Sequence, residues 1–205
     1  MRHAYSAALL IALLAAAAEA AVVALTIEPD DYADRTVLTT ILPQVVLEVA
    51  NENNDPSPLY KVTANVDGLN YAPTGQSVFG RSNVTFWSNI GRLKMTFTVP
   101  VSAVSLDFGS GSLFTPETGR LEIYDAADGL LDTYVTQPLL AGNPETMTVT
   151  DTSGEIAWAV AYVAAGEGTF GRLDHLVFIP APSTLTILAA GALALVRRRR
   201  RLDRR

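Results

Sequence analysis

Apolar and polar residues alternate with a period of two along much of the chain between residues 92 and 178. In the segment 92–99 every odd position is apolar, which places Leu93, Met95, Phe97 and Val99 on one face of a half-buried strand. A break follows at Pro100. The alternation then recurs in short runs that contain Val104, Leu106 and Phe108, then Leu121 and Ile123, then Met147 and Val149, then Ile156, Trp158, Val160 and Tyr162, and finally Leu176 and Phe178.

Turn residues separate these runs. Asp128-Gly129 lies between two alternating segments and predicts a hairpin, because both residues tolerate a positive φ. The segments 45–51 and 60–66 add two more expected strands, and no amphipathic helix of ten or more residues interrupts residues 21–179. Strands about ten residues apart predict an all-β, antiparallel β-sandwich, with a closed barrel as the alternative. Without an internal repeat or a linker, residues 21–179 are expected to form one domain.

The N-terminus has the pattern of a signal peptide, residues 1–20. Arg2 and His3 precede an apolar run over residues 7–18. Ala18, Glu19 and Ala20 then form the small-x-small sequence that signal peptidase cleaves, which would leave Ala21 as the mature terminus. A membrane anchor or a buried helix is the alternative.

The C-terminus combines a proline motif, an apolar segment and a basic cluster in residues 180–205. The apolar segment, residues 185–196, spans about 18 Å as a helix, whereas a bilayer core is about 30 Å thick. Five arginines, residues 197–201, follow it and favour the cytoplasmic side of a membrane. We expect a short C-terminal hydrophobic helix in the membrane, either transient or retained as an anchor.

Charge and cysteine content exclude some ligands and some covalent modifications. Residues 21–179 carry 7 Lys or Arg and 19 Asp or Glu, so this acidic domain is not expected to bind nucleic acid. The chain has no cysteine, which excludes both disulfides and lipoprotein acylation. An exported domain of this kind must rely on its hydrophobic core for stability.

Residues that could carry catalysis are few. His175 is the only histidine after the expected signal peptide, and the chain has no Gly-x-Ser-x-Gly motif that would point to a catalytic triad. The string Gly166–Gly171 matches a dinucleotide-binding fingerprint, but an expected strand follows it instead of a helix. Asp125 and Asp132 could form a hydrolytic carboxylate pair, although solvated loop residues are the simpler interpretation. We therefore expect no enzymatic activity.

The C-terminal segment resembles the PEP-CTERM sorting signal. Pro180, Pro182, Ser183 and Thr184 match its motif, Ala181 stands where the family has glutamate, and Arg197, Arg198, Arg199, Arg200 and Arg201 form the basic cluster. The resemblance implies recognition by an exosortase, which removes the tail and passes the protein through the inner membrane to the cell surface or outside the cell.

The domain also resembles the jelly-roll domains that are common in PEP-CTERM proteins, in segments such as 30–40, 73–80 and 173–178. The last of these, Leu-Asp-His-Leu-Val-Phe, is similar to the end of calcium-containing carbohydrate-binding modules. By this resemblance, Asp174 is expected to meet Asp30 or Asp31 around a structural Ca²⁺, since calcium takes oxygen ligands.

Two functions follow from these observations. The first is a non-catalytic β-sandwich displayed at the cell surface or in the extracellular matrix. The second is a carbohydrate-binding module for envelope polysaccharide or exopolysaccharide, in which aromatic side chains stack on sugar rings. The candidate aromatic residues are Tyr60, Tyr71, Trp87 and Tyr124, of which Trp87 is expected in the core.

Overall fold

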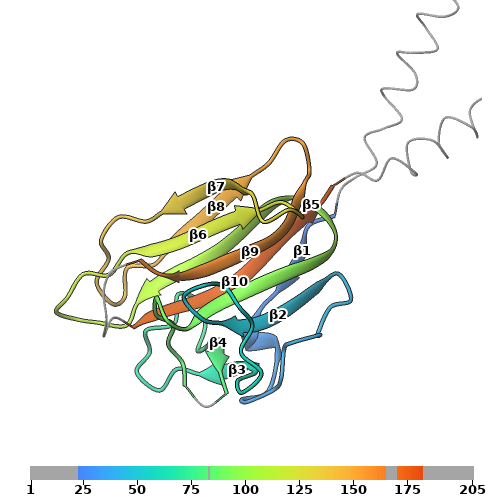
Figure 1. The fold of residues 1–205 in the computed structure, drawn as a ribbon. Coiled ribbons are helices and arrows are strands. Elements are labelled where there is room, and N and C mark those ends of the chain that lie inside the picture. Colours follow the sequence, from blue (N-terminus) through green and yellow to red (C-terminus); the bar gives the residue numbers. More distant parts are fainter. Residues whose placement is uncertain (1–22, 83, 165–169, 182–205) are drawn as a thin grey trace, which may run out of the picture. The chain divides into compact units, whose positions relative to one another are not determined.

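The computed structural model describes residues 23–82, 84–164 and 170–181, which contain ten β-strands and one short 3₁₀ helix (Figure 1). The strands and the helix all lie in one unit, Ala24–Pro180. Their bounds are β1 Leu25–Ile27, η1 Pro29–Asp31, β2 Val45–Ala50, β3 Val62–Val66, β4 Ser77–Arg81, β5 Arg92–Ser110, β6 Gly119–Tyr124, β7 Leu130–Val135, β8 Glu145–Thr150, β9 Ile156–Val163 and β10 Gly171–Pro180.

Every pairing between these strands is antiparallel. The all-β, antiparallel fold class is therefore confirmed. The jelly-roll-like arrangement is a finer assignment and stays a prediction. Among the described residues no helix is both long enough and apolar enough to cross a membrane. The expected signal peptide with Ala18, Ala20 and Ala21, and the tail from Pro182 onward, lie outside the described residues.

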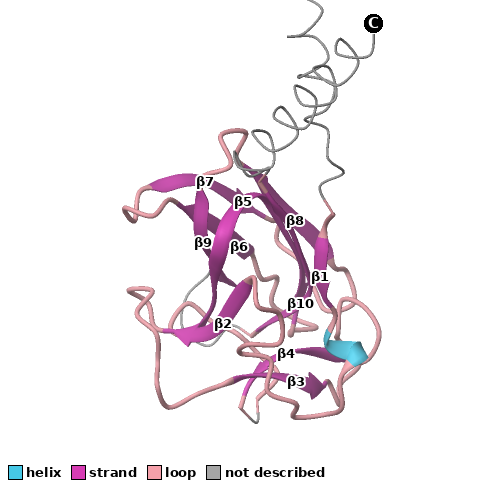
Figure 2. Cartoon of the chain, turned by 90° about the vertical axis from the view of Figure 1, so that its right-hand side faces the viewer, coloured by secondary structure: helices cyan, strands magenta, loops and turns pink. Residues whose placement is uncertain are grey.

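The strand β5 belongs to two sheets. Its first half, residues 92–97, pairs with β2 and β9, and β9 continues to β6 and β7. Its second half, residues 101–110, pairs with β10 and β8, and β10 also pairs with β1 and β4. Figure 2 shows β2, β9, β6 and β7 on one side, and β10, β8 and β1 on the other. All ten described strands are thus connected by hydrogen bonds, and we refer to the two parts that meet at β5 as the two sheets.

The expected break at Pro100 is wrong, because β5 runs through this residue as one strand of 19 residues. Proline has no backbone N–H and makes no ladder hydrogen bond as a donor. The register with β9 shifts between Thr96 and Val101, on either side of this proline. Pro100 therefore marks the point where β5 changes sheets.

The core lies between the two sheets, and both halves of β5 contribute to it. Leu93, Met95 and Phe97 are buried, as the alternation predicts. Val104, Leu106 and Phe108 are also buried, from the second half. Phe97 meets Phe178 of β10 with their ring centroids 5.2 Å apart. Trp87 is fully buried, as expected, and its Nε1–H donates to the carbonyl oxygen of Phe79 at 2.6 Å.

Gly119 offers a test of how tightly this core is packed. A Cβ at this position of β6 would overlap the ring of Phe108, which is fully buried. We expect Gly119→Ala to lower the free energy of unfolding by about 1–3 kcal/mol, the usual cost of overpacking. Gly68 is the matched control, because a Cβ there would meet nothing within 4 Å. Urea denaturation measures both variants, and equal stabilities would contradict the packing described here.

Candidate functional site

The outer face of β9 carries large aromatic side chains, whereas two alanines lie on its inner face. Each inward-facing alanine of β9 lies between two large core residues: Ala161 between Leu93 and Leu121, and Ala159 between Met95 and Ile123. Trp158, Val160 and Tyr162 point the other way and form a second cluster with Tyr124. These three residues share a face, as the alternation indicates, but that face is on the outside of the sheet. Ile156, expected beside them, belongs to the main core instead.

Two aromatic rings stack on this outer face. Trp158 of β9 and Tyr124 of β6 are cross-strand partners. Their ring centroids are 3.8 Å apart and their planes differ by 3°. Lys94 of β5 places its Nζ 4.5 Å from the Trp158 ring centroid. Arg92 places its guanidinium carbon 3.9 Å from the ring centroid of Tyr162. Cations and aromatic rings therefore stabilise one another across three neighbouring strands.

A buried carboxylate connects the two tyrosines. Glu122 of β6 accepts a hydrogen bond from the hydroxyl of Tyr124 at 2.8 Å and from that of Tyr162 at 3.1 Å. Arg120 pairs with the same carboxylate at 2.7 Å. Burial, together with Glu122, raises the pKa of Tyr124 to about 12 and also raises the pKa of Tyr162. Both hydroxyls are thus neutral hydrogen-bond donors to Glu122.

Two loops border this face, and both use a residue with a positive φ. Asn54, in the loop after β2, has φ 65°. Its side-chain oxygen accepts from Arg92 at 2.9 Å and its backbone oxygen accepts from Lys94 at 3.0 Å. Asp128, in the β6–β7 hairpin, has φ 62° and accepts a hydrogen bond from Nε1–H of Trp158 at 3.0 Å. The hairpin expected at Asp128-Gly129 is present.

We refer to this outer face as the β9 platform, which comprises Arg92, Lys94, Glu122, Tyr124, Trp158 and Tyr162. It combines aromatic rings with hydrogen-bond donors and acceptors whose positions are fixed by their neighbours. Such a combination suits ligands that carry hydroxyl groups on apolar rings. It contains one of the four aromatic residues that the sequence suggests for sugar binding, Tyr124. Tyr60 and Tyr71 lie outside it, and Trp87 is in the core.

Trp158 and Tyr162 are not among the predicted binding residues, because alternating large residues such as those of β9 are equally typical of a core strand. A central strand of a sandwich can present either of its faces to the core. One signal could have identified the outer face: Arg92 and Lys94 occupy the outward positions of the neighbouring strand, where cations are favourable beside aromatic rings.

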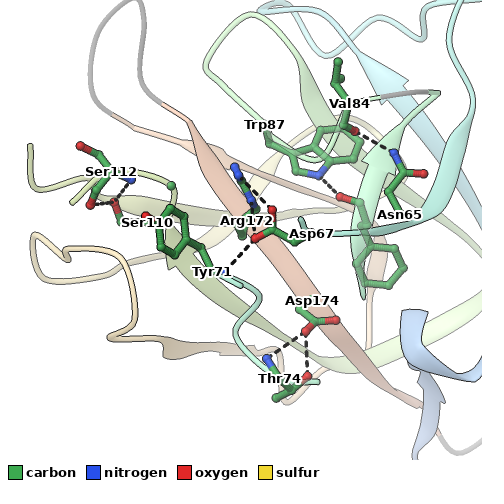
Figure 3. A network of polar contacts seen from close by, with 12 residues as sticks. Asn65, Asp67, Tyr71, Thr74, Val84, Trp87, Ser110, Ser112, Arg172 and Asp174 are labelled. Atoms are coloured by element: carbon green, nitrogen blue, oxygen red, sulfur yellow. Dashed lines mark hydrogen bonds and ion pairs between the residues drawn. The ribbon is translucent and has the colours of Figure 1, made fainter. Parts of the chain in front are cut away.

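Two of the three carboxylates predicted to bind calcium, Asp30 and Asp174, hold one loop in place. Asp174 is fully buried and accepts hydrogen bonds from the backbone N–H and the hydroxyl of Thr74, at 3.1 and 2.7 Å (Figure 3). Asp30 accepts from the backbone N–H of Ser77 at 2.9 Å, whereas Asp31 is exposed. Within the described residues no three His, Asp or Glu side chains are grouped to hold a metal ion. Asp30, Asp31 and Asp174 therefore do not form such a group, and calcium stays a prediction.

A buried ion pair fixes the same loop at its other end. Arg172 of β10 faces Asp67, with Nε–Oδ2 and Nη2–Oδ1 distances of 3.3 Å each (Figure 3). The Asp67 carboxylate also accepts from the backbone N–H of Tyr71 at 2.8 Å. The loop of residues 67–76 is thus joined to β10 by Asp67 and by Asp174. Removing one partner of such a pair would leave a buried charge without its counterion.

The remaining catalytic candidates have local structural contacts. His175 meets Glu28 with its Nδ1 2.6 Å from Oε2. Asp125 accepts from the backbone N–H groups of Ala127 and Gly129, both at 2.8 Å, and so closes the β6–β7 turn. Asp132 accepts from the adjacent N–H of Thr133 at 2.7 Å. Of the glycine string, only Phe170 and Gly171 are described, and Gly171 begins β10.

Comparison with known proteins finds no matching family model and no matching curated protein. Several solved structures are similar at low identity. The K2 cleaved adhesin domain of Lys-gingipain is 12% identical, with a TM-score of 0.49, over 76% of this chain and 99% of that one. A family 29 carbohydrate-binding module variant is 12% identical, with a TM-score of 0.36, over 65% and 90%. Arthrobacter globiformis T6 isomalto-dextranase complexed with panose is 11% identical, with a TM-score of 0.36, over 77% and 32%. At these TM-scores the likenesses carry no argument about function.

Two neighbouring groups on β10 make stability depend on pH. Burial, and secondarily the nearby Glu28, raise the pKa of Asp174 to about 7. The hydrogen bond with Glu28 raises the pKa of His175. In both cases the folded state holds the proton more tightly than the unfolded chain, whose values are about 3.9 and 6.5. Their contribution to stability is therefore complete below these unfolded values and is lost as the pH rises through the folded ones.

We expect the free energy of unfolding to fall between pH 5.5 and pH 8.5, and to fall less in Asp174→Asn. Asp151→Asn is the control, since hydrogen bonds with Ser153 and Glu155 lower the pKa of Asp151 and move its titration below this range. Urea denaturation at both pH values measures the differences. A wild-type slope in Asp174→Asn would contradict the raised pKa of this group.

Proposed function

We propose that this chain is an exported protein that an exosortase sorts to the cell surface or extracellular matrix, where it acts by binding and not by catalysis. The place of Pro180 carries the proposal. This residue is the last of β10 and pairs with Val101 of β5, so the proline motif begins at the end of the last described strand. On this proposal a sorting enzyme reads the motif from that end of β10. On this proposal, signal peptidase and exosortase are its partners during export.

Intact mass of the protein from a host that contains an exosortase tests this sorting. We expect a mature species that begins at Ala21 and lacks the segment after the proline motif. A variant with both Pro180→Ala and Pro182→Ala is expected to keep its arginine cluster and to stay in the membrane fraction. Recovery of the wild-type chain at full length from the cytosol would contradict export. An exported wild-type chain that keeps its arginine cluster would contradict tail removal.

A second candidate function is carbohydrate binding, and the β9 platform is the observation that favours it. Trp158 is only 9% exposed and Tyr162 only 8%, although both lie on the outside of the sheet. Neighbouring charged and aromatic side chains of the same face account for this shielding. Their fixed positions reduce the entropy that a ligand must overcome on binding. We infer that polysaccharide of the envelope or of the secreted matrix binds there.

Affinity gel electrophoresis with soluble polysaccharides tests the platform. We expect Tyr124→Ala, which removes a partly exposed ring, and Trp158→Ala, which removes the ring that supports Tyr124 and Lys94, each to weaken binding by about tenfold or more. Tyr60→Ala is the control, because Tyr60 is an exposed aromatic residue outside the platform. Circular dichroism establishes that each variant is folded. Equal retardation of folded wild type and Trp158→Ala by every polysaccharide would refute this site.

A further inference from the structure

Two cations lie close together on the β9 platform of an otherwise acidic domain. Residues 21–179 carry 19 acidic and 7 basic side chains, so carboxylates outnumber the basic side chains with which they could form ion pairs. Arg35, Arg120 and Arg172 each pair with one. Within the described ranges, Lys61, Arg81, Arg92 and Lys94 form no ion pair; of these, Arg92 and Lys94 lie together on the same face of β5.

Neutral groups hold these two cations. Arg92 donates through Nε to the carbonyl oxygen of Asn89 at 2.8 Å and through Nη1 to the side chain of Asn54. Lys94 donates to the backbone oxygen of Asn54. The rings of Tyr162 and Trp158 support the charged ends without neutralising them. Both positive charges therefore remain available to a ligand, and their positions are set in advance.

The carboxylates on the same face do not remove this charge. Glu122 already accepts hydrogen bonds from two tyrosines and forms an ion pair with Arg120. Glu48 of β2 is the cross-strand neighbour of Lys94, but the two side chains form no ion pair. Arg92 uses only two of its five N–H donors in the hydrogen bonds described above. A guanidinium with free donors, beside an ammonium, is suited to binding a carboxylate.

We propose that the β9 platform binds an anionic polysaccharide, with Arg92 and Lys94 pairing with the carboxylates of its sugar units. This inference rests on the proposed function, because it names the chemical class of polysaccharide that the same face takes. A neutral polysaccharide would leave two desolvated cations without a counterion, at a cost in affinity. The acidic remainder of the domain would repel ligand bound elsewhere, so charge complementarity also directs the polysaccharide to this face.

Polygalacturonate and its methyl ester are the matched probes, because they share a backbone and differ in charge. Binding is measured by affinity gel electrophoresis on the full chain in detergent, in a background where Arg197, Arg198, Arg199, Arg200 and Arg201 are each changed to Gln, so that the basic tail does not contribute. We expect polygalacturonate to bind at least about tenfold more tightly than the ester, and more weakly as salt is added.

The test variant carries Arg92→Gln and Lys94→Gln, and it should lose about tenfold in affinity for polygalacturonate with little change for the ester. The control variant carries Arg35→Gln and Lys61→Gln, which remove the same charge from exposed positions outside the platform, and it should bind as the parent does. Circular dichroism and urea midpoints establish that both variants are folded.

The outcomes separate this inference from the proposed function. Equal binding of both probes, lost in Trp158→Ala but unaffected by Arg92→Gln and Lys94→Gln, would overturn the charge preference and leave carbohydrate binding intact. Binding of neither probe would overturn both. Single-stranded DNA is a third probe. If it bound as tightly as polygalacturonate, and with the same sensitivity to the two substitutions, the platform would recognise charge alone and the inference would fail.

Discussion

The backbone hydrogen bonds of β5 join the strands of the two sheets in this domain. This one strand of 19 residues pairs with β2 and β9 through its first half and with β10 and β8 through its second. No other strand joins both sheets directly along such a length. Because the two sheets share a strand, their separation and twist are set by the same stretch of chain. Pro100 supports this arrangement by removing a donor where β5 passes from one sheet to the other.

The β9 platform follows from the way the sheets fill the space between them. Leucine, methionine and isoleucine side chains of β5 and β6 occupy that space opposite the middle of β9, where β9 places the small residues Ala159 and Ala161 on its inner side. Its larger residues must then lie outside, where they would be unfavourably exposed on their own. Stacking with Tyr124 and the cations of β5 covers them. The outer cluster is therefore a consequence of core packing as well as a candidate site.

Local patterns in the sequence predict the strands well and the site poorly. The alternation at Leu93, Met95 and Phe97 depends only on neighbours along the chain, and so does the turn at Asp128, so both were predictable. Contacts between distant segments leave no such pattern. Thr74 meets Asp174 across 100 positions, and Asp67 meets Arg172 across 105. The orientation of β9 belongs to this second class, because it depends on which strands become its neighbours.

The pairing of β1 with β10 has a mechanical consequence. Leu25 lies opposite Phe178, so the chain enters and leaves the domain at one end of the sheets (Figure 1). Suppose that β10 is pulled at Pro180 along its own axis while β5 is held. The force then runs parallel to the two strands, and all the hydrogen bonds between them are loaded in shear together. Bonds loaded together resist rupture better than bonds opened one after another. The described domain is therefore suited to bearing load applied along β10.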